Sequence, residues 1–292
     1  MFSLVKYDKN IHFSAWQDFV RDNGHLYHDI RWLDIINFSY GLEPFYHLIY
    51  DSDKLIALAP FFKISNSKLL SLPFISFAGL CFHKDISENE VEKITEDLML
   101  KTELGNYEIE LRTMKGKINE NSESEGHKKK YVTMIKNLEG DIDTVFKNFD
   151  KKQRNMIRKA EQEPFELVDC NLDTYYKIYL KATNDLGTPG HRKEFFGRII
   201  ENFRDSVRLK LLKRNKMEVG VLFEIDYFRT RYDMWAFSLK EFFQYKPNVF
   251  MYWETLKNAI ETGIERYDFG RSTIAGGIYN FKKIYDEIVK YT

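Results

Sequence analysis

Residues 247–269 read PNVFMYWETLKNAIETGIERYDF, a helix followed by a strand, and this stretch decides how the surrounding chain folds. Pro247 suits the first turn of a helix, where its missing N–H is not needed. Apolar residues then recur at spacings of four, three and four, which places them on one helix face. They are Val249, Trp253, Leu256 and Ile260. Gly263 can adopt the left-handed conformation that ends a helix, and residues 266–269 follow as a strand.

Two helical patterns and three strand-like runs lie upstream of this helix–strand pair. The helices are expected at 172–186 and 192–203, and the strands at 207–213, 219–227 and 230–238. Tight links at Asn215 and Phe228 make the three strands an antiparallel meander. A meander that leads into one helix–strand unit predicts a mixed sheet flanked by helices, not a doubly wound parallel sheet.

The first half of the chain repeats the same order. Helices are expected at 13–23 and 31–39, strands at 45–50, 55–63, 69–77 and 107–112, and a further helix from Ser87, with Glu90 at the spacing of a capping box. The sequence therefore predicts an α/β (α+β) fold of two similar tandem domains, 1–140 and 141–292. The second domain is predicted to begin with a basic linking helical region at 141–162. The extreme carboxy terminus can pack on the first domain.

Two further segments lie between the repeats. Residues 119–130 are polar and rich in Glu, Ser and Lys, which indicates an exposed loop. A short strand is expected at 131–138.

Composition excludes several classes of protein. The 292 residues are 43% hydrophobic, which rules out global disorder. Forty-four basic residues balance forty-four acidic ones, so a generally basic coat for nucleic acid is excluded and no DNA partner is expected. Cys81 and Cys170 cannot form a disulfide framework, and no Cys, His or acidic cluster has metal-ligand spacing. No apolar stretch reaches the ~20 residues of a membrane helix, and the first ten residues lack a signal-peptide core. A cytoplasmic protein is expected.

The densest basic segment is a candidate phosphate site. On a helix, Lys151, Arg154 and Arg158 share one face. Guanidinium groups match the oxygens of a phosphate, so this face could bind a phosphate-bearing ligand. The alternative is an ordinary solvated helix face that Glu161 and Glu163 balance.

The end of the last predicted strand is the second candidate site. Asp268 and Arg271 lie where the strand gives way to a loop, and Lys282 follows a pair of glycines. A lysine beside such a loop can stabilise a developing oxyanion, although a turn with a surface lysine pair would look the same. Asp226, Asp233 and Asp268 could each act as a base, yet strand-end aspartates usually bond local backbone.

Aromatic residues around the last long helix are a weaker candidate. Tyr245 and Trp253 belong to this group. They could wall a groove for a lipid or a sugar, or simply belong to the core.

The chain resembles the Fem-type acyltransferases, which are built from two GNAT-like domains, and in particular the Fem-like proteins of exopolysaccharide and PEP-CTERM loci. The resemblance spans nearly the whole chain. It rests on Tyr27–Asp29 with Trp32, Ala59–Phe62, Ser71–Phe74, Arg154–Ala160, Leu186–Pro189, Pro247-Asn248 with Tyr252–Glu254, Asp268–Ser272, and Tyr279 with Phe281-Lys282. Two features depart from the family: the long coiled-coil arm is missing, and Tyr285-Asp286 replaces the usual Trp-Gly after the lysine.

The resemblance implies an enzyme that transfers an acyl group to an amine. Lys282 would face the reacting carbonyl, Phe281 and Tyr279 would shape the pocket, and Asp268 and Arg271 would organise the loop. Arg154 and Arg158, with Lys151, would meet phosphates of donor or acceptor, and Trp253 and Tyr245 would add to substrate binding.

The resemblance also implies the partners. No cofactor is expected to be tightly bound; acyl-CoA, or alternatively aminoacyl-tRNA, would be the co-substrate. The acceptor would be an amine on a surface polysaccharide or cell-wall precursor, met at the inner membrane face through peripheral contact. The neutral charge and the missing arm favour acyl-CoA over tRNA-dependent peptidyl transfer in peptidoglycan bridge formation. A non-catalytic module that binds a glycan or lipid carrier is a third hypothesis.

Overall fold

The computed structural model describes residues 2–112, 114–117, 131–273, 282 and 288–291. Contacts divide the chain into two compact units, Met1–Gly116 with Tyr291–Thr292, and Lys117–Lys290. This division precedes the boundary at 140/141 expected from the sequence, because the strand at 131–137 pairs within the second unit's sheet. Along the described residues, no helix has the length and apolarity needed to cross a membrane.

The first unit contains helices on both faces of a mixed sheet. Its elements are β1 (Phe2–Lys6), α1 (Lys9–Asn23), η1 (Leu26–His28), α2 (Arg31–Tyr40), β2 (Glu43–Asp51), β3 (Lys54–Ser65), β4 (Lys68–Ser71), β5 (Cys81–Phe82), α3 (Glu88–Lys101), η2 (Glu103–Asn106) and β6 (Glu108–Glu110). The sheet order is β1-β2-β3-β4-β6, with β5 on β3. All pairs are antiparallel except β4 with β6, which α3 connects.

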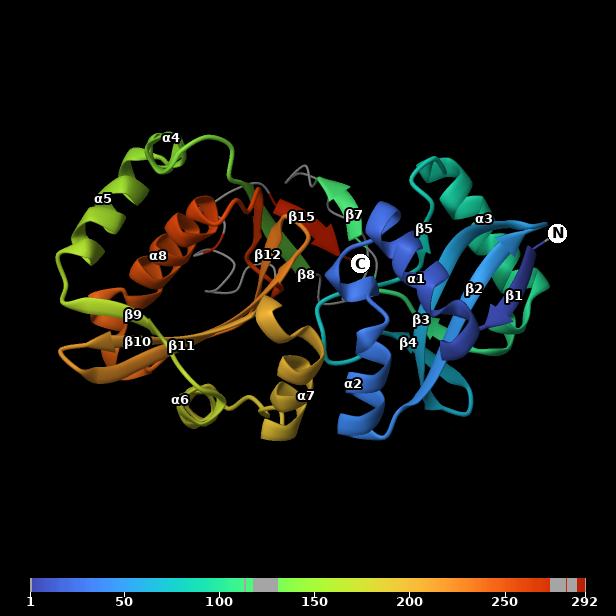
Figure 1. Cartoon of the computed structure of the whole chain (residues 1–292), viewed down its shortest axis with the longest axis horizontal. Helices are drawn as coiled ribbons and strands as arrows, with labels where there is room; N and C mark the ends of the chain where they lie inside the picture. Colours follow the sequence, from blue (N-terminus) through green and yellow to red (C-terminus); the bar gives the residue numbers. More distant parts are fainter. Residues whose placement is uncertain (1, 113, 118–130, 274–281, 283–287, 292) are drawn as a thin grey trace. The chain divides into compact units, whose positions relative to one another are not determined.

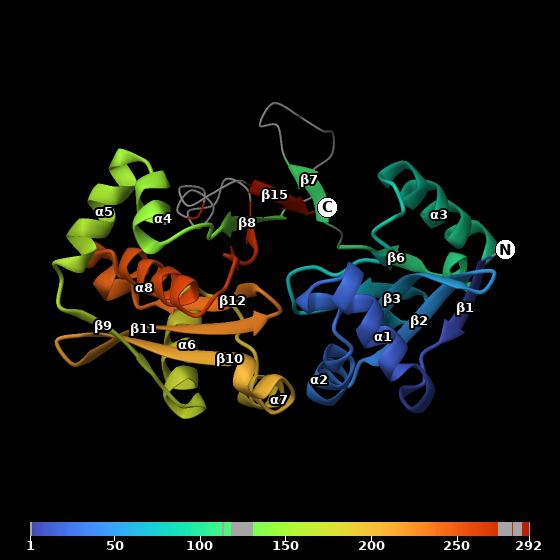
Figure 2. The same ribbon diagram turned by 45° about the horizontal axis from the view of Figure 1, so that its top comes forward.

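Successive side chains of β2 point alternately to the two faces of this sheet. Phe45 and Ile49 point to the face that Leu98 of α3 covers. Tyr46 points to the other face, where it stacks on Trp16 of α1. Figure 2 shows α3 on one side of the strands and α1 and α2 on the other.

The second unit repeats this plan on a larger scale. β7 (Met114–Lys117) lies at the boundary between the two units. The elements of the second unit are β8 (Tyr131–Asn137), α4 (Ile142–Asn148), α5 (Lys151–Glu161), β9 (Phe165–Asp169), α6 (Leu172–Asp185), α7 (Lys193–Phe203), η3 (Arg204–Ser206), β10 (Val207–Arg214), β11 (Met217–Tyr227), β12 (Thr230–Ser238), η4 (Lys240–Tyr245), α8 (Pro247–Glu261), β13 (Arg266–Asp268), β14 (Ser272–Thr273) and β15 (Ile288–Tyr291). The strands run β9-β10-β11-β12-β13-β8, then β15, with β14 on β8.

The helices of the second unit lie on both faces of its sheet (Figure 1). α8 and α5 pack on each other on one face, with a core that includes Ile157, Leu222 and Leu256. α6 and α7 cover β10 and β11 on the opposite face. The pair β12 and β13 is parallel because α8 connects them, as α3 connects β4 and β6 in the first unit.

The predicted element order and the mixed α/β class are confirmed in both units. The predicted helix ends are confirmed at two positions. Ser87 and Glu90 form the capping box of α3. Gly263 adopts a left-handed conformation, and the N–H of Ile264 bonds back to Ala259 O at 2.9 Å.

Two predicted elements differ from the structure, and two edge strands were missed. The strand expected at 69–77 ends at Ser71, because Leu72 and Phe74 take positive φ angles of 42° and 69°. The helical region at 141–162 is two helices, since Phe149 is extended and Asp150 caps α5. The edge strands β1 and β9 were not predicted. The loop predicted at 119–130 lies outside the described residues.

Candidate functional site

Strands β12 and β13 diverge at the point where the candidate loop begins. Their parallel register covers Thr230–Tyr232 against Arg266–Asp268, while β12 continues to Ser238. A bulge lies just past this point, because Glu224 pairs with Asp233 but Phe223 pairs with Trp235. Residues 234–237 are half-buried, although β12 is an interior strand. Among the described residues, the pairing of β13 with β12 therefore ends at Tyr232.

Asp268 organises the turn at the end of β13. Its Oδ1 accepts hydrogen bonds from Thr133 Oγ1 and, at 2.8 Å, from the N–H of Gly270. Burial raises the pKa of Asp268 to about 6, although both hydrogen bonds favour the charged form. Gly270 has a φ of +69°, and a Cβ there would lie 2.3 Å from Asp233 O. Only glycine therefore lets the turn close against β12.

Lys282 is buried beside this turn, with 7% of its surface exposed. Its Nζ donates to Phe269 O and lies 3.4 Å from Asp233 Oδ2. Tyr252, from α8, donates its hydroxyl to the same Oδ2 at 2.6 Å. The second oxygen, Asp233 Oδ1, is buried and has no hydrogen-bond partner among the described residues.

Burial raises the pKa of Asp233, and the neighbouring Lys282 and Tyr252 oppose that rise. We call Asp233, Tyr252, Asp268, Phe269 and Lys282 the strand-end cluster. The sequence analysis proposed Lys282 and Asp268 as site residues beside one loop. It gave Asp233 little weight and considered Tyr252 only as part of an aromatic group, because their contacts join residues far apart in the chain. Whether these residues are catalytic stays a prediction.

Arg271 is exposed and lies near His191, whose ring packs against Phe195 and Trp235. Burial, together with the smaller effect of the Arg271 charge, lowers the pKa of His191 to about 4. Sequence reasoning did not single out His191. Tyr279 and Phe281, both expected at the site, lie outside the described residues.

One of the three residues of α5 predicted to bind phosphate, Arg154, hydrogen-bonds to the protein's own backbone. Arg154 donates to Lys147 O at 2.9 Å and to Phe149 O, which satisfies carbonyls at the end of α4. Arg158 lies 5.3 Å from the centre of the Phe146 ring and is exposed. Lys151 is exposed as well. A phosphate would therefore meet Lys151 and Arg158 more readily than Arg154.

The two aromatic candidates have structural contacts. Trp253 is buried against Phe146 and Phe149 and donates its Nε1 to Glu161 at 2.9 Å. The Tyr245 ring lies 3.6 Å from the guanidinium carbon of Arg214. These contacts favour the alternative interpretation of both residues as packing groups.

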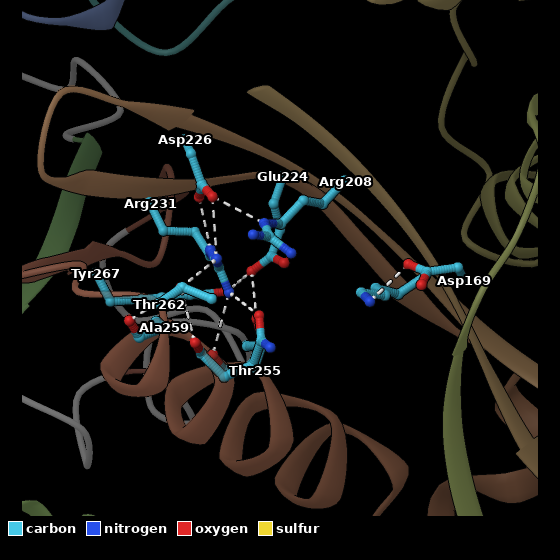
Figure 3. Close-up of polar contacts among 11 residues, drawn as sticks. Asp169, Arg208, Glu224, Asp226, Arg231, Thr255, Ala259, Thr262 and Tyr267 are labelled. Atoms are coloured by element: carbon cyan, nitrogen blue, oxygen red, sulfur yellow. Dashed lines mark hydrogen bonds and ion pairs between the residues drawn. The ribbon is translucent and has the colours of Figure 1, made fainter. Parts of the chain in front are cut away.

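A second polar cluster joins the same strands to α8 (Figure 3). Arg231 donates to both oxygens of Asp226 at 2.7 and 3.0 Å, and Arg208 donates to Asp226 at 2.8 Å. These ion pairs hold the pKa of Asp226 below its ordinary value. Glu224 Oε1 accepts from Thr255 at 2.7 Å and from Tyr267 at 2.7 Å. Asp226 is thus committed to ion pairs and is a poor candidate for a base.

Charged residues at alternate positions of β10, β11 and β12 could have revealed this network in the sequence, because such residues share one face. Among the described residues, no group of His, Cys, Asp and Glu has an arrangement that could hold a metal ion.

Comparison with known proteins identifies the class of domain. A family model described as an acetyltransferase (GNAT) domain matches residues 147–283. The structure of FemX superposes with a TM-score of 0.66 at 13% identity, over 99% of this chain and 96% of FemX. A tandem GNAT protein from the clavulanic acid biosynthesis pathway gives 0.61 at 5% identity, over 100% and 97%. The curated proteins contain no match.

A third structure has the same fold. It is the C-terminal domain of a putative lysylphosphatidylglycerol synthetase from Agrobacterium fabrum, with a TM-score of 0.56 and 9% identity over 97% of this chain and 92% of that one. The chain thus has the fold of two tandem GNAT-like domains. The family match supports an acetyltransferase (GNAT) domain at residues 147–283, and the structural matches extend the likeness in fold over the rest of the chain.

Proposed function

We propose that the protein is an N-acyltransferase that moves an acyl group from acyl-CoA to an amine at the strand-end cluster. The buried ammonium of Lys282, just past the end of β13, carries this proposal. An ammonium has three N–H donors. Two face Phe269 O and Asp233, which leaves one for a developing oxyanion.

The stretch of β12 that continues beyond its pairing with β13 is suited to an acyl-CoA donor. The pantetheine arm of CoA carries amide groups that can hydrogen-bond to strand backbone, as an added strand would. The arm would then deliver the thioester carbonyl to the point where β12 and β13 separate. The half-buried side chains of residues 234–237 support a groove of this kind.

The reaction needs little covalent participation from the protein. The amine nitrogen attacks the thioester carbon, and the carbonyl oxygen takes up negative charge. The C–S bond breaks as the carbonyl re-forms, and the thiol leaves with a proton that the amine gives up. Lys282 stabilises the oxyanion, and Asp233 and Tyr252 hold Lys282 in place.

The remaining predicted residues keep supporting roles in this proposal. Asp268 fixes the turn, Phe281 and Tyr279 shape the pocket, and Arg271 orders the loop. Exposed Lys151 and Arg158 contact phosphates, with Arg154 holding α4 beside them.

The acceptor in this proposal is the amine of an exopolysaccharide or cell-wall precursor, reached in the cytoplasm at the inner membrane face. A second candidate is aminoacyl-tRNA-dependent peptidyl transfer in peptidoglycan assembly. The exposed basic residues of α5, namely Lys151, Lys152, Arg158 and Lys159, favour it as a surface for nucleic-acid phosphates.

A thermal-shift experiment separates these functions. Acetyl-CoA is expected to raise the melting temperature, and thiol release from acetyl-CoA is expected when an amine acceptor is added. A shift with charged tRNA but not with acetyl-CoA would favour the peptidyltransferase. No shift with either, together with binding of a glycan, would favour a non-catalytic module and contradict the proposal.

A further inference from the structure

A cavity of about 260 Å³ lies in the second unit between α8 and the outer strands of the sheet. Leu167 of β9 and Lys210 of β10 line it on the sheet side, and Glu254, Lys257, Asn258 and Glu261 line it on the helix side. The strand-end cluster meets α8 earlier, at Tyr252. The cavity, which we call the α8 pocket, therefore lies apart from the proposed acyl-transfer site.

Buried polar contacts fix the wall of the α8 pocket (Figure 3). Thr255, which also lines it, donates to Glu224 Oε1 at 2.7 Å. Asn258 accepts from Arg231 through its Oδ1 at 3.0 Å, so its amide nitrogen remains available as a donor. A wall held in this way loses little conformational entropy when a ligand binds.

One buried carboxylate behind this wall is incompletely satisfied. Glu224 is fully buried, and its Oε2 has no hydrogen-bond partner among the described residues. Such orphan groups are uncommon in native proteins and point to an unfilled polar role. Glu224 lies on β11, behind Thr255, and does not itself line the pocket.

The pocket offers a cation from the sheet and carboxylates from the helix. Lys210 is paired at 2.6 Å with Asp169, whose side chain is 84% exposed, so a ligand carboxylate can replace that weak surface bridge. Lys257 is already paired with Glu254 at 2.6 Å. Glu261 is exposed and has no ion pair within the described ranges.

We propose that the α8 pocket binds a small zwitterion of the size of a free amino acid. The ligand's carboxylate lies against Lys210 and the amide of Asn258, and its ammonium lies against Glu254 and Glu261. Pockets for drug-sized molecules are usually about 300–1,000 Å³. The α8 pocket, at about 260 Å³, is smaller and therefore suits a ligand of the size of an amino acid.

Isothermal titration of the full chain with glycine, L-alanine and L-lysine tests this site. At least one is expected to bind saturably, while acetate and methylamine, which carry one charge each, bind at least about 10-fold more weakly. Lys210→Met and Glu261→Gln are each expected to weaken binding about 10-fold or more. Lys240→Met, at an exposed lysine away from the pocket, is the matched control and keeps full binding.

Asp233→Asn distinguishes the α8 pocket from the strand-end cluster. Binding that survives Asp233→Asn but not Glu261→Gln supports the proposal, whatever the enzyme's acyl donor proves to be. Loss of binding in Asp233→Asn would place the amino acid at the strand-end cluster and overturn it. So would equal binding of acetate or methylamine, or no binding of any of the three amino acids. Glu261 is exposed, so its variant keeps the test valid even if Lys210→Met unfolds.

Discussion

Arg231 and Asp233 are two residues apart on the same face of β12, yet they differ in how many of their polar atoms have hydrogen-bond partners. Arg231 has five N–H donors, and five acceptors surround them, on Asp226, Thr255, Asn258 and Thr262. Asp233 contacts the same helix at Tyr252, but one of its carboxylate oxygens is buried without a partner among the described residues.

On our proposal, this difference separates a structural cluster from a site. A buried polar group without a partner costs about 1–3 kcal/mol, so an orphan oxygen such as Asp233 Oδ1 calls for an explanation. The Arg231 guanidinium needs nothing more and holds the strands to α8. In the proposed function, the described partners of the strand-end cluster leave one oxygen of Asp233 and one N–H of Lys282 for a substrate.

Removing the Arg231 guanidinium, whose five N–H groups all have acceptors, is expected to have the largest effect on stability. Arg231→Met leaves Asp226 and the Thr255 carbonyl without their buried partner, and should lower the free energy of unfolding by about 3–5 kcal/mol. Urea unfolding followed by tryptophan fluorescence measures it. Arg229→Met is the matched control, since Arg229 and Glu265 form an exposed pair and should contribute less than about 1 kcal/mol. An equal loss of unfolding free energy in Arg231→Met and Arg229→Met would show that the Arg231 cluster is not a structural cluster.

The pH dependence of stability should report Asp268. Its pKa is raised to about 6 when folded, above the value of about 4 expected for an unfolded aspartate. The folded state therefore binds more protons between these values, and this residue's contribution to stability falls as pH rises from about 4 to 6. The difference amounts to about 3 kcal/mol for two pKa units.

Asp268→Asn keeps the oxygen that accepts from Thr133 and Gly270 but cannot titrate. Relative to the native protein, the variant should gain stability as pH rises through this window. Urea unfolding at pH 4, 5, 6 and 7 provides the comparison. Parallel curves for the two proteins would show that Asp268 has an ordinary pKa.

Asp233→Asn should slow acyl transfer and leave the Michaelis constant for acetyl-CoA nearly unchanged. The variant loses the charge that holds Lys282, and a hydrogen bond to a charged group is worth about 1.5–3 kcal/mol, or roughly 10- to 100-fold in rate. Steady-state thiol release measures the change. Asp173→Asn, at an exposed aspartate of α6, is the control. A raised Michaelis constant at unchanged turnover would assign Asp233 to binding instead.

The sequence predicts the order of elements well because the signals are local. The Ser87–Glu90 capping box, Pro247 and Gly263 each act within a few residues, and their helices begin and end as expected. The edge strands β1 and β9 were missed, because pairing partners such as His47 and Lys210 lie in other parts of the chain.

The candidate site was only partly predictable for the same reason. Lys282 and Asp268 are close in sequence to one loop, but the contact of Lys282 with Asp233 spans 49 residues. The stripe of Lys151, Arg154 and Arg158 was visible, yet nothing local shows that the carbonyls of α4 occupy Arg154.

Arg154→Ala is expected to have the smallest effect. It tests whether Arg154 supports the end of α4 while exposed Lys151 contacts the ligand. Arg154→Ala should lower the free energy of unfolding by about 1 kcal/mol, because it leaves carbonyls at the end of α4 without their donor. Lys151→Ala, at an exposed position, should leave stability unchanged while reducing the salt dependence of ligand binding. Thermal melts and titrations at low and high salt measure both. An Arg154→Ala protein of native stability would return Arg154 to the ligand-binding face.

The steady-state turnover of Lys282→Met tests the central claim most directly. Methionine keeps the length of the side chain and removes the ammonium. With acetyl-CoA as donor, turnover should fall about 10²–10³-fold, as expected for a lost oxyanion donor, while the Michaelis constant stays nearly constant. The Arg231→Met protein, measured beside it per folded molecule, should keep most of its turnover. A well-folded Lys282→Met protein with native turnover would show that the strand-end cluster is not the site of acyl transfer.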